Sequence, residues 1–273
     1  MHLKRIDCLP MALSTNRTRP VVLAIAGYDP SSGAGITADI KTITAQGCYG
    51  VTCITSLTVQ STRGVRSVEP VEGKLITEIL DELVTDIEIS AVKIGMLGTA
   101  EATRAVTGFL KRYSPRRVVL DPVLVSSSGA SLLAKDGLPL LKDRLVGLVS
   151  VITPNAAEAA TLTGLKVDTL EEMELAARRL RQMGARSVIV TGGHLDPPSD
   201  LIIAETSPTP VILTGVKVLS RSTHGTGCAF STALACKLAQ GRNLVPAAKA
   251  AKSFVETSLK NAPLLGRGIG PVV

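Results

Sequence analysis

The order of apolar and helical segments along this chain constrains its fold more than any other feature. From residue 21 onward, short runs rich in Val, Ile and Leu that end at Gly or Pro alternate with segments of helical spacing. Buried strands of a parallel sheet have this continuous apolar character, because helices cover both of their faces. The alternation therefore predicts an α/β fold with parallel strands joined by right-handed crossovers.

The expected strands and helices follow one another from residue 21 to the end of the chain. Strands are expected at residues 21–27, 50–61, 91–97, 117–123, 149–155 and 187–193, with two further strands within 200–219. Helices are expected at 34–47, 72–86, 99–113, 155–164, 170–184, 225–241 and 243–261, with a broken helix at 130–145. No internal repeat or low-complexity linker interrupts the series, so we predict one domain over residues 21–273. The polar and basic residues 1–20 are expected to form a disordered extension.

Composition and charge narrow the classes of partner. Apolar residues make up 45% of the 273 residues but aromatic residues only 2%, so the core must be aliphatic. The net charge of +7 would suit a nucleic-acid-binding protein, but the basic residues are scattered and the aromatic residues that stack on bases are few. We therefore expect no nucleic-acid partner and a surface that favours small anionic ligands.

The cysteines and the apolar runs indicate where the protein works. Five cysteines form neither a CxxC pair nor a Cys/His cluster, which favours free thiols in a reducing compartment and hence a cytoplasmic protein. No run of about 18 apolar residues occurs, so no membrane-spanning helix is expected.

Small and polar residues gather directly after the expected strands, where ligands bind in open α/β sheets. The segments are GYDPSSGAGITAD, TVQSTRG, DPVLVSSSG, TPNAAE, TGGH and THGTGC. Each has an alternative, purely structural interpretation. A glycine-rich loop can be a tight turn, Asp121 before a proline can be a turn residue, and Asn155 with Glu158 fits a helix capping box.

The segment STHGTGCAFSTAL, residues 222–234, raises the question of why a cysteine stands at the start of a helix. Neither a Walker A motif nor a complete Rossmann GxGxxG motif is present. The backbone N–H groups of Gly225, Gly227 and Cys228 would instead converge at a helix N-terminus and form an anion hole. The same electrostatic field is expected to lower the pKa of the Cys228 thiol. The alternative is that Cys228 is a small buried apolar residue, and that His224 is a hydrogen-bonding loop residue.

These motifs, together with VVLAIAGYDPSSGAGITADIKT, VKIGML and VVLDPVLVSSSG, resemble the hydroxymethylpyrimidine/phosphomethylpyrimidine kinases. The resemblance extends from about residue 21 to the closing GIGPV. It implies a ribokinase-like three-layer α/β/α sandwich with a central, mostly parallel sheet of eight or more strands. It also implies ATP-dependent phosphorylation of 4-amino-5-hydroxymethyl-2-methylpyrimidine, and then of its monophosphate to the diphosphate, in thiamin diphosphate biosynthesis. A homodimer is the implied assembly, and ATP and Mg²⁺ are the implied cofactors.

The resemblance also implies a role for each candidate residue. The pyrimidine pocket would be lined by Gly27, Asp39, Gln60, Met96 and Val123. Gln60 and the backbone near Val123 would form hydrogen bonds to the aminopyrimidine ring. The ATP phosphates would be met by Asp121, Asn155, Glu158, Thr191 and Lys93. Asp121 and Glu158 would hold Mg²⁺, partly through water. Catalysis would use Gly225, Gly227 and Cys228, the last at a position where most relatives in the superfamily carry aspartate.

A cysteine at that position suits an enzyme that phosphorylates two acceptors in turn. The second acceptor is a phosphomonoester that is mostly dianionic at neutral pH, and an aspartate would repel it. A thiol can be neutral in one step and partly ionised in the other. The hypothesis predicts that Cys228→Asp impairs the second phosphorylation more than the first.

Two residues depart from the family pattern and leave other functions open. Thr191 stands where a lysine commonly meets ATP phosphates, and Tyr28 stands where a small serine is usual. Lys93 is a candidate to replace the missing cation. A pyridoxal or pyridoxine kinase is therefore an alternative, and a pyrimidine sensor with little catalysis is another.

Overall fold

The computed structural model describes residues 19–126 and 129–273. The predicted N-terminal extension lies almost entirely outside the described residues. Within them, the Pro20 carbonyl already accepts the N–H of Tyr49 at 3.0 Å, so residue 20 is joined to the sheet.

A nine-stranded sheet with the order β3-β2-β1-β4-β5-β6-β7-β8-β9 forms the centre of the molecule. The strands are Val21–Tyr28, Tyr49–Ser61, Gly64–Pro70, Ala91–Ile94, Val118–Leu120, Val151–Ile152, Ser187–Val190, Ser199–Ala204 and Ser207–Thr214, β1 to β9 in chain order. Strands β2, β1, β4, β5, β6 and β7 are parallel. The edges add antiparallel strands, β3 on one side and β8 with β9 on the other. The mostly parallel sheet predicted from the sequence is confirmed.

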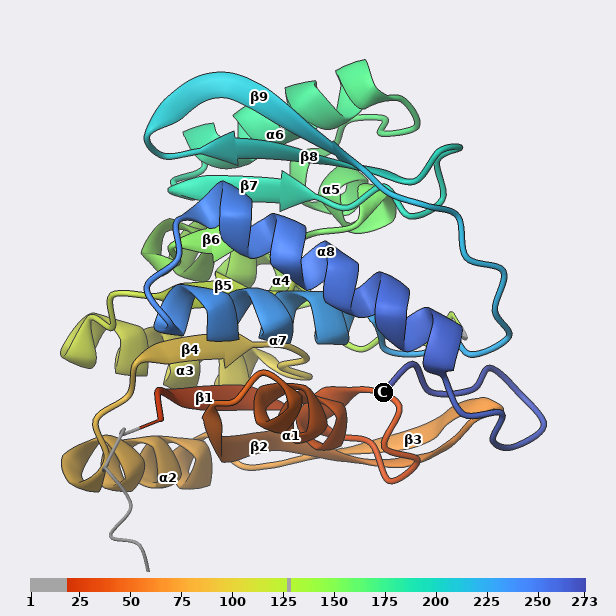
Figure 1. Ribbon diagram of the computed structural model, residues 1–273. Coiled ribbons are helices and arrows are strands. Elements are labelled where there is room, and N and C mark those ends of the chain that lie inside the picture. The colour runs from red at the N-terminus through yellow and green to blue at the C-terminus, as the bar shows by residue number, and fades with distance from the viewer. Residues whose placement is uncertain (1–18, 127–128) are drawn as a thin grey trace, which may run out of the picture.

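Helices cover both faces of this sheet and complete three layers (Figure 1). They are Gly35–Ala45, Gly73–Asp86, Ala100–Tyr113, Gly137–Leu140, Ala156–Thr163, Leu170–Gln182, Thr226–Ala239 and Leu244–Asn261, α1 to α8 in chain order. Helices α1, α7 and α8 pack on one face around an aliphatic cluster that includes Ile43 and Leu234. Helices α2 to α6 pack on the other face around a second cluster that includes Leu80 and Leu180.

Two segments differ from the sequence prediction. Strand β3 was not predicted, because residues 64–70 (GVRSVEP) are polar and only partly buried at the sheet edge. The broken helix expected at 130–145 begins only at Gly137 and continues as a π-helical turn, Leu141–Leu145, and a 3₁₀ turn, Val146–Leu148. Leu133 packs against Gly137 from the preceding loop, which explains the apolar pattern there without a helix.

The parallel strands all end at one edge of the sheet, and most of the predicted site residues lie there, whereas Lys93 lies within β4 and Asp39 within α1. The C-terminus reaches the same edge beside the end of β1 (Figure 1). Among the residues that the structure describes, no helix is long and apolar enough to cross a membrane.

Candidate active site

Helix α7 begins at this edge with a sharp glycine turn. Gly225 has a φ of +84°, which glycine adopts without strain, and a Cβ there would collide with the carbonyl oxygen of Gly33. The N-cap residue is Gly225 itself, which offers no side-chain hydrogen bond to the first turn of the helix. Because the first N–H groups of a helix have no partner inside it, the amides of Gly227 and Cys228 lie where an anion can be bound.

The Asp121 carboxyl group, directly after β5, is tied to this helix start. Ser231 of α7 donates a hydrogen bond to Asp121 Oδ2 at 3.0 Å. Burial raises the pKa of Asp121 above its usual value, although Lys93 and Ser231 oppose the shift. The geometry thus places one carboxyl group and one uncapped helix terminus side by side.

The prediction that the helix field lowers the pKa of Cys228 is wrong. Burial raises the pKa of the thiol to about 12, and the nearby charge of Lys93 does not compensate. The Asp121 and Asp39 carboxyl groups add to the rise. Cys228 is half-buried, and both its partial loss of contact with water and its proximity to two acidic groups disfavour the thiolate.

Lys93 and Asp39 form a buried ion pair behind the helix start. Lys93 Nζ lies 2.9 Å from each Asp39 carboxylate oxygen, and both side chains are 0% exposed. Thr232 of α7 donates to the same carboxylate at 2.6 Å. Burial opposes the charge of Lys93, but the Asp39 carboxylate raises its pKa above the usual value.

This pairing differs from the expected roles of both residues. Asp39 was expected in the pyrimidine pocket and Lys93 near the ATP phosphates, but each meets protein groups and neither reaches solvent. Lys93 is paired with Asp39 in this structure, and its contact with the ATP phosphates stays a prediction. The physical reason is that a buried lysine needs a carboxylate partner, which a sequence pattern cannot identify.

Asn155 and Glu158 form the capping box that was the structural interpretation of this motif. The N–H of Glu158 donates to Asn155 Oδ1 at 3.0 Å, and the N–H of Asn155 donates to Glu158 Oε2 at 2.9 Å. Burial and the nearby Asp121 raise the pKa of Glu158 to about 8. Thr191 lies beside Asn155 across an isolated bridge. The structure thus brings Asp121, Glu158, Asn155 and Thr191 together at the ends of β5, β6 and β7.

The remaining residues expected to line the pyrimidine pocket are Gly27, Gln60, Met96 and Val123. A Cβ on Gly27 would lie 2.9 Å from the Met96 sulfur, so the absence of a side chain at Gly27 lets Met96 pack there. The Val123 N–H already donates to the Asp121 carbonyl at 2.8 Å, which leaves the Val123 carbonyl to meet a ring. Gln60 lies at the end of β2 and contacts His224 at 3.0 Å.

The glycine-rich loop after β1 is closed by its own carboxylate. Asp29 Oδ1 accepts the N–H of Ser31 at 2.8 Å, and Oδ2 accepts those of Gly33 at 3.2 Å and Ala34 at 2.9 Å. Burial alone would raise the pKa of Asp29, but hydrogen bonds from His224 and Ser31 outweigh it and lower the pKa. The loop is therefore a structural turn, because its amide groups are already used.

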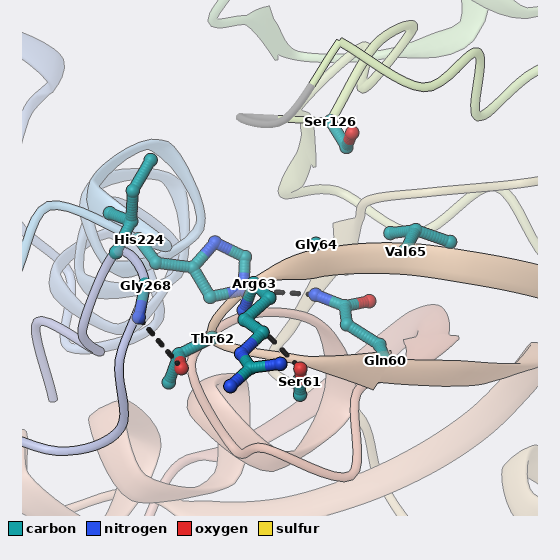
Figure 2. Close-up of a pocket in the computed structure, with 10 residues that line it drawn as sticks. Gln60, Ser61, Thr62, Arg63, Gly64, Val65, Ser126, His224 and Gly268 are labelled. Carbon is teal, nitrogen blue, oxygen red and sulfur yellow. Dashed lines mark hydrogen bonds between the residues drawn. The ribbon is translucent and has the colours of Figure 1, made fainter.

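A cavity of about 100 Å³ lies between the β2–β3 turn and the loop before α7. Figure 2 shows Gln60 and His224 pointing toward one another in it, with Ser126 on another side. The C-terminal segment closes the cavity, since Gly268 and Ile269 donate backbone hydrogen bonds to Thr62.

Sequence reasoning missed several residues of this site. Asp29 was not singled out because Asp-Pro after a strand is typical of a turn. Its partner His224 is 195 residues away, so no local pattern joins them. Ser231 and Thr232 looked like ordinary helix residues, and only the two carboxylates that they meet reveal their role.

Comparison with protein families gives a clear result. The sequence profile of the phosphomethylpyrimidine kinase family matches residues 29–273. The chain is 41% identical over 253 residues to the hydroxymethylpyrimidine/phosphomethylpyrimidine kinase of Escherichia coli, covering 92% of this chain and 95% of that protein. It is 42% identical over 266 residues to the thiamine biosynthesis bifunctional protein ThiED of Geobacter sulfurreducens, covering 96% of this chain but 54% of that longer protein.

Solved structures of two kinds of kinase share the fold. The phosphomethylpyrimidine kinase of Clostridium difficile is 34% identical with a TM-score of 0.78, over 88% of this chain and 99% of that one. The ADP complex of Bacillus subtilis pyridoxal kinase is 32% identical with a TM-score of 0.85, over 93% of this chain and 96% of that one.

Proposed function

Because the chain belongs to the phosphomethylpyrimidine kinase family, we propose that it phosphorylates 4-amino-5-hydroxymethyl-2-methylpyrimidine and then its monophosphate. ATP is the phosphoryl donor, and the product serves thiamin diphosphate biosynthesis. The observation that carries the proposal is the uncapped start of α7 beside Asp121. Phosphoryl transfer needs mainly positioning and charge stabilisation, and this terminus offers amide hydrogens to a migrating phosphoryl group.

Mg²⁺ is the metal that the carboxyl groups of this site fit. Burial and the nearby Asp121 carboxyl group raise the pKa of Glu158, so two acidic groups lie near each other at the ends of β5 and β6. Among the described residues no three His, Cys, Asp or Glu side chains gather as a metal cage. Mg²⁺ needs no such cage, since it binds through one or two carboxylates, waters and substrate phosphates. When bound, it would neutralise charge on the ATP phosphates.

We assign each residue of the site one role in this reaction. The transferred group is bound by Gly225, Gly227 and Cys228. Mg²⁺ would be held by Asp121 and Glu158, and the nucleotide phosphates would lie near Asn155 and Thr191. Gly27, Met96, Gln60 and the Val123 carbonyl form the acceptor pocket. Asp39 and Lys93 support α7 from behind.

A coupled assay of ADP release tests this function. The purified protein with Mg-ATP should turn over the hydroxymethyl compound and its monophosphate, and Cys228→Ala should slow both. Release of ADP without phosphorylated product would instead favour a sensor with little catalysis.

Pyridoxal phosphorylation is a second candidate, because solved pyridoxal kinases superpose with TM-scores of 0.85. The same assay with pyridoxal as acceptor separates the two activities. We expect a higher kcat/KM for the pyrimidine. A kcat/KM for pyridoxal that exceeds it would assign the chain to pyridoxal salvage.

We further propose that residues 21–273 act as one domain, and that the protein is a cytoplasmic homodimer. The single continuous sheet supports the first statement. The other two follow from the family resemblance and the unpaired cysteines. Analytical ultracentrifugation of the purified protein tests the dimer.

A further inference from the structure

The imidazole of His224 lies between two side chains from distant parts of the chain. Its Nε2 is 2.9 Å from Asp29 Oδ2, after β1, and 3.0 Å from the carboxamide of Gln60, on β2. Figure 2 shows the ring and the carboxamide facing each other across the cavity. One nitrogen atom thus meets both a carboxylate and an amide.

The position of this imidazole is fixed on several sides. A Cβ on Gly33 would collide with the ring, so the ring packs directly on the backbone of the turn before α1. The His224 N–H donates to the Gly270 carbonyl at 3.0 Å, and its carbonyl accepts the N–H of Val272 at 3.1 Å. Only 8% of the residue is exposed. Such a side chain is pre-organised and can impose an orientation on its neighbours.

The hydrogens in this group can be assigned from the partners. Asp29 is ionised at neutral pH, since its pKa is lowered, so His224 Nε2 must carry the hydrogen that faces the carboxylate. The Thr58 hydroxyl donates its only hydrogen to the Tyr28 carbonyl at 2.9 Å. Toward Gln60, which it meets at 3.2 Å, Thr58 can therefore only accept.

These two constraints determine how the Gln60 carboxamide is turned. Its oxygen must face the hydrogen on His224 Nε2, and its NH₂ group must face Thr58. Figure 2 draws the Gln60 carboxamide the other way round, with its nitrogen toward His224. The oxygen and nitrogen of a carboxamide are assigned from their hydrogen-bond partners, and these partners require a rotation by 180°. The Nε2 hydrogen is then shared between Asp29 and Gln60 in a three-centre hydrogen bond.

We propose that His224, anchored by Asp29, is a positioning residue that fixes the Gln60 carboxamide and thereby selects the acceptor ring. In this orientation Gln60 keeps one N–H and one oxygen lone pair for a ligand. An amino group next to a ring nitrogen offers the matching pair, because its N–H meets the oxygen while the ring nitrogen accepts the amide N–H. A ring that bears a carbonyl next to a protonated nitrogen presents the reverse pattern and is rejected. Its carbonyl oxygen would face the Gln60 oxygen, and its ring N–H would face the Gln60 N–H.

This inference rests on the proposed function, because it names the ring edge that the proposed acceptor presents. The test compares 4-amino-5-hydroxymethyl-2-methylpyrimidine with the analogue that carries a 4-oxo group. In the wild type kcat/KM should favour the amino compound by about 10⁴-fold, the scale of discrimination expected when the polar groups of a site are mismatched.

His224→Leu frees Gln60 to rotate, so the ratio of the two kcat/KM values should fall at least tenfold. KM for the amino compound should rise, while KM for ATP stays unchanged. His224→Gln keeps an N–H near the position of Nε2 and should restore most of the discrimination. Thr58→Val removes the acceptor for the Gln60 NH₂ without touching His224, and should lower the ratio in the same direction.

Two results would overturn the inference. One is an unchanged ratio in His224→Leu or, if that variant does not fold, in Thr58→Val. The other is a ¹⁵N NMR spectrum of the wild type that shows Nε2 of His224 without a hydrogen at neutral pH. A wild type that phosphorylates neither pyrimidine contradicts the proposed function instead, which keeps the two failures distinct.

Discussion

Two glycine-containing turns precede helices at the same edge of the sheet, and they differ in what their amide groups meet. Residues 29–34 lead into α1 and residues 222–228 lead into α7, and neither helix has a side chain from its N-cap residue bonded to its first turn. In the first turn the Asp29 carboxylate accepts three backbone N–H groups. In the second turn Gly225 and Gly227 offer no side chain that could do so.

The comparison teaches that glycine content does not distinguish a structural turn from an anion site. What distinguishes them is whether a carboxylate of the protein already occupies the amides. The two turns also interlock, because Gly33 and Gly225 lack the side chains that would collide there. We call residues 29–34 the closed turn, because the Asp29 carboxylate accepts its amide groups, and residues 222–228 the open turn. The closed turn supports the open turn. Substitutions that add a carboxylate to the open turn, or remove it from the closed turn, test this comparison.

Closing the open turn should have the largest effect. Gly227→Asp places a carboxylate at the start of α7, much as Asp29 stands before α1. A Cβ at residue 227 approaches nothing nearer than Asp121 Oδ2 at 4.0 Å, so the fold should persist. We expect kcat/KM to fall at least about 100-fold, the scale seen when an oxyanion site is lost.

The control for that variant is Gly227→Ala, which adds the Cβ without the charge. It should keep most of the activity and the same melting temperature. Equal losses in Gly227→Ala and Gly227→Asp would show that space, and not charge, governs this position.

Opening the closed turn should act first on stability. Asp29→Ala leaves the amides of Ser31, Gly33 and Ala34 without their acceptor, which should lower the free energy of unfolding by about 1–3 kcal/mol. Urea denaturation measures this loss. Asp29→Asn keeps an acceptor oxygen and should lose less, and an Asp29→Ala protein as stable as the wild type would refute the assigned role of the carboxylate.

Replacing the thiol at the open turn should separate the two phosphorylations. Cys228→Asp adds a negative charge that repels the anionic monophosphate more than the neutral hydroxymethyl compound. We expect the ratio of second to first kcat/KM to fall about tenfold, measured with both acceptors under the same conditions. Cys228→Ala serves as the uncharged control, and a larger loss in the first step would contradict the hypothesis.

The smallest effect concerns the reactivity of the thiols. Because the pKa of Cys228 is raised to about 12, its alkylation rate should climb with each unit of pH through pH 9 without levelling off. The pKa of Cys48 is lowered to about 7, chiefly by a hydrogen bond from Cys236, so its rate, which burial keeps slow, should level off above about pH 8. Peptide mass spectrometry after timed iodoacetamide treatment resolves the two sites. A plateau for Cys228 below pH 8 would restore the expectation of a thiolate.

The sequence predicts the sheet and its ligand edge well, because both depend on local periodicity. The apolar run at residues 21–27 and the helix at 34–47 nearly coincide with β1 and α1. Strand β3 escapes prediction because an exposed edge strand buries too little to show a pattern. The start of α7 was predicted from its glycines, whereas its lack of a cap could be seen only in the structure.

The finer features of the site depend on contacts between distant segments. Asp39 and Lys93 are separated by 54 residues, so no local sequence pattern shows that their side chains form a buried ion pair. The pKa of Cys228 was misjudged for the same reason, since the helix start is visible in the sequence but the burial of the thiol and its neighbours Asp121 and Asp39 are not. Asn155 and Glu158 show the opposite case, because their capping box is local and was anticipated.

The central claim is that the open start of α7 binds the phosphoryl group in transit. Calorimetric dissociation constants of AMP-PCP and ADP with Mg²⁺, for the wild type and Gly227→Asp, test it most directly. The variant should weaken AMP-PCP at least tenfold more than ADP, because only AMP-PCP carries the third phosphate. Equal weakening of the two nucleotides, or none, would contradict the account.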